Sequence, residues 1–98
     1  MQYIIDGKKF DTSKSELVIK FKQRAKELTR SFLFEDGKYN PMCEASMYRT
    51  TKGAFAIIRK RENYTEKEII SEAEAKDILE TLNEVEKIEK LFGNLEEI

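Results

Sequence analysis

The chain has 98 residues, among them 18 Lys and Arg, 19 Asp and Glu and no histidine, with a formal net charge of −1. This length predicts a single small domain, residues 1–98, in which a basic part, 1–61, precedes an acidic part, 62–98. Because histidine is absent and Cys43 is the single cysteine, the composition excludes an internal disulfide and argues against zinc binding and Ser-His or Cys-His catalysis.

The first segment, YIIDGKKF, is typical of a β-hairpin. Residues 3–5 are strand formers, Asp6-Gly7 is a two-residue turn signal, and residues 8–10 supply the returning strand. A hairpin this short needs a partner surface, so we expect it to pack on the rest of the domain.

The next segment, DTSKSELVIKFKQRAKEL, predicts a basic α-helix. Ser13 and Glu16 match a capping box at its start. Its apolar stripe, at spacings of four, four and three, consists of Leu17, Phe21, Ala25 and Leu28. On such a helix a basic ridge is formed by Lys22, Lys26 and Arg30. The ridge either neutralises phosphates or only keeps the helix soluble, and the sequence leaves both interpretations open.

The middle of the chain predicts strands. Residues 31–35 indicate a strand before a turn at 36–37, and residues 45–50 and 54–60 indicate two paired strands joined by a turn at Gly53. The last of these is apolar on both faces, which predicts a central strand. We expect the cations that follow it to leave the sheet for solvent, namely Arg59, Lys60 and Arg61.

The end of the chain predicts a short strand at residues 68–70 and then a long acidic helix from about 72 to 91. Ser71 and Glu74 form a second capping box, and Gly93 is expected to end the helix. One apolar face runs along it through Ile78, Leu82, Val85, Ile88, Phe92 and Leu95. This face either covers the sheet along its whole length or leaves its second half for a homodimer partner.

These elements predict an α+β domain. Its small antiparallel sheet, formed by two hairpins or a meander, packs with a first basic helix and a long acidic C-terminal helix. No apolar run reaches the roughly 20 residues needed to span a bilayer. The start of the chain lacks the features of a signal peptide, and we expect a cytoplasmic protein.

The charge is divided unevenly along the chain. Residues 1–61 contain 14 Lys and Arg and 7 Asp and Glu, giving +7, whereas residues 62–98 contain 4 and 12, giving −8. Such asymmetry predicts contact with nucleic acid or an acidic interaction segment, unless the two parts neutralise one another within the fold. The carboxylates form no compact cluster typical of an active site, so we expect no enzyme, metal or cofactor, although nuclease activity is left open.

Three segments, IIDGKKFDTSKSE, MYRTTKGAFAI and IISEAEAKDIL, resemble a family of small proteins of Firmicute bacteria, their phages and conjugative elements. The family carries an I-N-G-K-x-Y-D-T-x-T-A opening, a central Y-R-T-x-x-G strand pair and an acidic closing helix. The matching positions are Ile5, Gly7, Lys8, Phe10, Asp11, Thr12, Tyr48, Arg49, Thr50, Gly53 and Phe55. Phe10 replaces the usual tyrosine, and RKRENYTEKE replaces a Gly-rich segment after the second central strand.

Some members or relatives of this family resemble type II anti-CRISPR proteins, which inhibit the Cas9–guide RNA machinery. The resemblance implies a phage or mobile-element protein that binds and inhibits a host defence nucleoprotein. It identifies no catalytic residues.

Two surfaces are candidates for this contact. A basic surface would bind guide RNA or other nucleic acid through Lys22, Lys26, Arg30, Tyr48, Arg49, Lys52, Arg59, Lys60 and Arg61. An acidic surface would enter a basic channel of the host effector protein with Asp77, Glu80, Glu84 and Glu86. The alternatives are a small dimeric nucleic-acid-binding regulator and a protein-interaction module without nucleic-acid contact.

Overall fold

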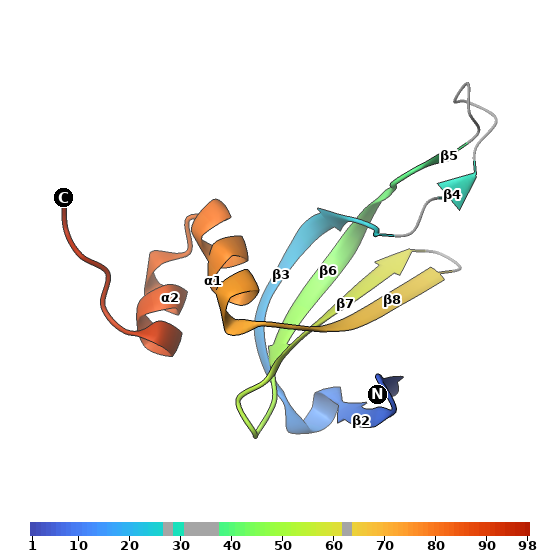
Figure 1. Cartoon of the computed structure of the whole chain (residues 1–98), viewed down its shortest axis with the longest axis horizontal. Coiled ribbons are helices and arrows are strands. Elements are labelled where there is room, and N and C mark those ends of the chain that lie inside the picture. The colour runs from blue at the N-terminus through green and yellow to red at the C-terminus, as the bar shows by residue number, and fades with distance from the viewer. Residues whose placement is uncertain (27–28, 31–37, 62–63) are drawn as a thin grey trace.

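The computed structural model describes residues 1–26, 29–30, 38–61 and 64–98. Its centre is a four-stranded antiparallel sheet in the order β3 (Glu16–Arg24), β6 (Met42–Arg49), β7 (Phe55–Arg61) and β8 (Tyr64–Ile70) (Figure 1). Two helices follow, α1 (Glu72–Thr81) and α2 (Val85–Phe92), which makes the fold α+β as predicted. Neither of these described helices is long and apolar enough to cross a membrane.

Two short antiparallel pairs accompany this sheet. The predicted N-terminal hairpin consists of β1 (Gln2–Ile5) and β2 (Lys8–Asp11), and its turn has positive φ at Asp6 (51°) and Gly7 (75°). Positive φ at both turn residues matches the right-handed twist of the two strands. The second pair is β4 (Thr29–Arg30) with β5 (Lys38–Tyr39). The strand and turn predicted over residues 31–37 lie outside the described residues.

The segment that contains β4 and β5 leaves and re-enters the sheet at one place. The Ala25 amide donates to the Pro41 carbonyl at 2.7 Å, and the Asn40 side-chain amide donates to the Ala25 carbonyl at 3.0 Å. These two hydrogen bonds close the base of the segment.

The predicted basic helix after the hairpin is wrong. Residues 12–14 form a short 3-10 helix, η1 (Thr12–Lys14), and the chain then continues as β3. Asp11, rather than Ser13, caps this turn, because its carboxylate accepts hydrogen bonds from the Ser13 hydroxyl at 2.6 Å and the Ser13 amide at 3.0 Å. These bonds stabilise the charged carboxylate and hold the pKa of Asp11 below its usual value.

Residues 19–22 favour a strand because apolar and basic side chains alternate along them. Ile19 and Phe21 pack toward the core, whereas Lys20 and Lys22 are exposed between them. Pairing with β6 buries one side of this alternation, which outweighs the helical spacing of the same apolar residues. A bulge at Val18 shifts the register between Leu17 and Ile19 and turns Val18 into the core.

The helices cover one face of the sheet. Phe55 of β7 stacks on Phe92 of α2 with 5.6 Å between ring centroids. The buried side chains of this layer are Val18, Ala45, Met47, Phe55, Ile57, Ile70, Ala75, Leu79 and Ile88.

The N-terminal hairpin covers part of the opposite face. Ile5 and Phe10 are buried there against Ala56 and Ile58 of β7. Because successive side chains of a strand alternate between faces, β7 is buried on both sides and is central, as predicted.

The predicted long C-terminal helix is interrupted. Ser71 caps α1 as expected, because its hydroxyl accepts from the Glu74 amide at 3.1 Å. The chain then turns at Asn83, which has φ 56°, and α2 begins two residues later. The break folds Ile88 onto the sheet and leaves Val85 exposed, so most of the apolar stripe covers the core. Gly93, with φ 99°, ends α2 as predicted.

We expect Ile57→Ala to lower the free energy of unfolding by about 3 kcal/mol, because Ile57 is only 1% exposed between the sheet and the helices. Ile4→Ala is the matched control, since Ile4 is 69% exposed and its truncation should change stability by less than about 0.5 kcal/mol. Chemical denaturation checks both values, and equal effects of the two substitutions would contradict the described core.

Candidate nucleic-acid interface

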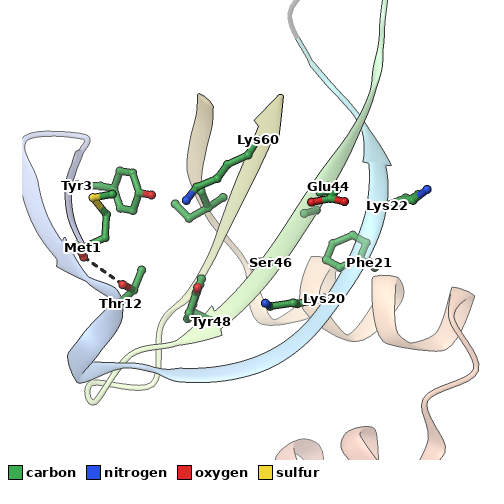
Figure 2. A pocket seen from close by; sticks show the side chains of 12 residues that line it. Met1, Tyr3, Thr12, Lys20, Phe21, Lys22, Glu44, Ser46, Tyr48 and Lys60 are labelled. Atoms are coloured by element: carbon green, nitrogen blue, oxygen red, sulfur yellow. Dashed lines mark hydrogen bonds between the residues drawn. The ribbon is translucent and has the colours of Figure 1, made fainter. Parts of the chain in front are cut away.

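An open pocket lies on the face of the sheet opposite the helices, beside the N-terminal hairpin (Figure 2). Its volume is about 520 Å³. Three lysines line it, Lys20 and Lys22 from β3 and Lys60 from β7, together with Tyr3 from β1 and Tyr48 from β6. The remaining lining residues are Met1, Thr12, Phe21, Glu44, Ala45, Ser46 and Ile58.

The register of the strands gathers the polar side chains. Lys22 pairs with Glu44, and Glu44 pairs in turn with Lys60, so these three residues form one row across β3, β6 and β7. Lys20 pairs with Ser46 in the next row. Cross-strand partners share a face of the sheet, which places all five side chains on the open face.

The two tyrosines are held in place by one buried ring. Phe10 stacks on Tyr3 with 6.4 Å between ring centroids and meets Tyr48 edge-on at 5.7 Å. The Lys67 ammonium lies 5.9 Å from the centre of the Tyr3 ring. Figure 2 shows the Tyr3 ring and the Lys60 side chain directed toward one another across the pocket. Phe10 therefore supports the rings of Tyr3 and Tyr48, and the sides of the two rings that face the pocket remain open.

Opposite charges gather on the two sides of the sheet. Counting the described residues of β3, β6, β7 and β8, the open face carries five cations, Lys20, Lys22, Arg24, Lys60 and Lys67, and one carboxylate, Glu44, which gives 5 − 1 = +4. On the helical side, residues 72–98 contain 3 Lys and 9 Asp and Glu, giving 3 − 9 = −6. Among the described residues, one ion pair joins the helices to a basic strand, Lys90 Nζ to Glu16 Oε1 at 3.7 Å. The salt bridges of the described residues all join residues 1–61 to residues 62–98, so these two parts of the chain neutralise one another in part, whereas the open face and the helices keep net charges of opposite sign.

The structure brings only some of the predicted basic residues together. Lys22, Tyr48 and Lys60 line the pocket. Arg49 and Lys52 lie beside the β6–β7 turn, at the other end of the sheet. The predicted basic ridge therefore does not form.

Three further predicted residues lie elsewhere. The Lys26 ammonium pairs with a Glu68 carboxylate oxygen at 2.8 Å. Arg61 is exposed and follows Lys60 on β7, so it faces the other side of the sheet. The side chain of Arg30 in β4 lies outside the described part of the chain.

The prediction that Arg59 reaches solvent is wrong, because its side chain is 1% exposed. Its guanidinium donates to Glu66 at 2.9 Å, to Gln23 at 3.0 Å and to Glu68. The Lys26 backbone amide also donates to Glu66, at 2.9 Å. A buried guanidinium needs hydrogen-bond partners, and the side chains of Glu66, Gln23 and Glu68 supply one for each of its three nitrogens. Arg59 therefore joins β7 to β3 and β8.

Four of the polar or aromatic residues of the pocket were not predicted as binding residues. Lys20 lay within the predicted helix, Tyr3 and Ser46 lay in predicted strands with no binding role, and Glu44 lay just before the strand predicted at residues 45–50. The alternation of Lys20 and Lys22 with Ile19 and Phe21 is the sequence signal that could have found a basic strand face.

The predicted acidic residues all lie in the helical part. Asp77 and Glu80 belong to α1, Glu84 precedes α2 and Glu86 lies in its first turn. All are exposed except Glu84, which is half-buried. In the described ranges, no three His, Cys, Asp or Glu side chains group so as to hold a metal ion.

Comparisons with family models, curated proteins and solved structures give no match for this chain. Function is therefore inferred below from the side chains of the pocket and from the family resemblance of the sequence.

We expect Arg59→Met to lower the free energy of unfolding by about 3 kcal/mol, because it removes the buried guanidinium that pairs with the partly buried carboxylates of Glu66 and Glu68. Arg61→Met is the matched control at an exposed position and should have little effect. Adding Glu66→Gln and Glu68→Gln to Arg59→Met should recover part of the loss. Urea denaturation checks the series, and a neutral Arg59→Met would show that the ion pairs do not support the fold.

Proposed function

We propose that this protein binds single-stranded nucleic acid through the open face of its sheet. The observation that carries the proposal is the meeting of three lysines and two tyrosines in one pocket of about 520 Å³. Lysines that contact phosphates supply affinity independent of sequence, and aromatic rings bind unpaired bases by stacking. The excess of cations on this face would also attract a polyanion from a distance.

A single strand fits this surface better than a duplex. Both described helices lie on the far side of the sheet, in a region with a net charge of −6. Neither of these two helices is therefore a basic helix of the kind that enters a major groove. In a duplex the bases are stacked on one another, whereas an unpaired base is free to stack on Tyr3 or Tyr48.

We further propose that the strand belongs to the guide RNA of a host Cas9-type nucleoprotein, which this protein inhibits. The resemblance to a family with anti-CRISPR relatives supports this choice of target. Three of the positions that carry the resemblance build the pocket, since Tyr48 and Thr12 line it and Phe10 supports both tyrosines. Homodimerisation through the C-terminal helices remains a separate prediction.

Replacing Lys20, Lys22 and Lys60 together by glutamine should weaken binding to a single-stranded oligonucleotide at least tenfold at low salt. Each lost phosphate contact should lower the slope of log affinity against log salt by about 0.7, so the slope should fall by roughly 2. Fluorescence anisotropy with a labelled strand over a range of salt concentrations measures both quantities.

The matched control replaces Lys76, Lys87 and Lys90, which lie on the helical side, and makes the same change in net charge. If the two triple variants bind equally, the open face of the sheet is not the binding surface.

Adding the protein to a purified Cas9–guide RNA complex should slow cleavage of the target DNA, and the open-face triple variant should lose this effect. A gel assay of cleavage against protein concentration measures the inhibition. If oligonucleotides bind and cleavage is unaffected, the target is wrong while the binding face stands. If inhibition depends instead on Asp77, Glu80 and Glu86, the acidic helical side makes the contact.

A further inference from the structure

Of the described residues that line the pocket, Glu44 is the only one with a carboxylate. In the strand register it lies between Lys22 and Lys60, and its side chain is exposed. A cross-strand ladder of alternating charge would explain it, and such pairs stabilise sheets. Yet none of the salt bridges and side-chain hydrogen bonds in the described part of the chain involves the Glu44 carboxylate. Its oxygens are therefore open to a ligand.

A carboxylate is unfavourable on a face that binds phosphates, because the two anions repel one another. Its presence in the middle of the lysine row is favourable if the ligand also offers hydrogen-bond donors at that point. The bases of a nucleic acid offer such donors, whereas the phosphates and sugar ring oxygens only accept. In RNA the ribose 2′-hydroxyl also donates, but every nucleotide carries one, so it does not distinguish one nucleotide from another. Glu44 is thus placed to contact a base while the lysines contact the backbone.

The same strand carries the stacking and the hydrogen-bonding side chains. Glu44, Ser46 and Tyr48 alternate along β6 and all line the pocket. Glu44 and Tyr48 are four residues apart, which corresponds to about 13 Å along a strand. A nucleic-acid strand that follows β6 would therefore stack one base on Tyr48 and bring a later base to Glu44.

We infer that Glu44 selects guanine at this second position, an inference that rests on the proposed function. An ionised carboxylate only accepts hydrogen bonds, and its two oxygens accept two parallel donors. Guanine alone presents two adjacent donors, N1–H and N2–H₂, on its Watson–Crick edge. Adenine and cytosine present one amino group each, and uracil places its single N3–H between two carbonyl oxygens. The order of preference is guanine first and uracil last.

The test compares oligouridines of about ten nucleotides with the same strands carrying guanosine, adenosine or cytidine at one central position. The wild-type protein should bind the guanosine strand about tenfold more tightly than the all-uridine strand. Glu44→Gln should abolish this preference, because an amide offers one acceptor and one donor. Its affinity for the all-uridine strand should stay the same or rise, because a negative charge has been removed.

Glu72→Gln is the matched control, since Glu72 lies in the first turn of α1, on the helical side of the sheet, and its replacement makes the same change in charge. It should keep the guanosine preference. Equal affinity of the wild type for all strands overturns the inference and leaves the proposed function standing, as does a preference that survives in Glu44→Gln. Absence of binding to every strand removes the proposed function and this inference with it.

Discussion

Burial of β7 on both of its faces is the constraint on which the rest of the structure depends. The apolar side chains of Phe55 and Ile57 must be shielded from water on one face of the sheet, and those of Ala56 and Ile58 on the other. The helices cover Phe55 and Ile57 on the first side. The N-terminal hairpin covers Ala56 and Ile58 on the second, but its strands have only four residues each and cannot cover the whole face. The uncovered remainder is the open face with its lysines.

The sheet also divides the charges of the molecule. The acidic helices lie behind it and the basic strand residues in front, so the weak net charge of −1 conceals a strongly dipolar protein. A polyanion would therefore be turned toward the open face as it approaches, before any contact forms. The buried Arg59 belongs to neither surface, because its charge is matched inside the fold by Glu66 and Glu68.

Two turns and one helix cap were predicted correctly from short stretches of sequence. The turn at Gly7, the turn at Gly53 and the cap at Ser71 depend on a few neighbouring residues, and all were found. The strand β3 was taken for a helix, because its apolar residues also recur at helical spacing and its pairing partners in β6 lie between 18 (Arg24 to Met42) and 33 (Glu16 to Arg49) residues away in the chain. The burial of Arg59 depends on residues of two other strands, so no local pattern reveals it.

The hydrogen-bonded junction at Ala25 and Pro41 bears on where this domain can accept insertions and deletions. The two hydrogen bonds there hold both ends of the intervening segment together. Once the ends are fixed, each doubling of the enclosed length adds only about 0.6 kcal/mol of closure entropy. Insertions and deletions between Lys26 and Asn40 should therefore leave both faces of the sheet intact, so this is the place where the domain can acquire or exchange a module.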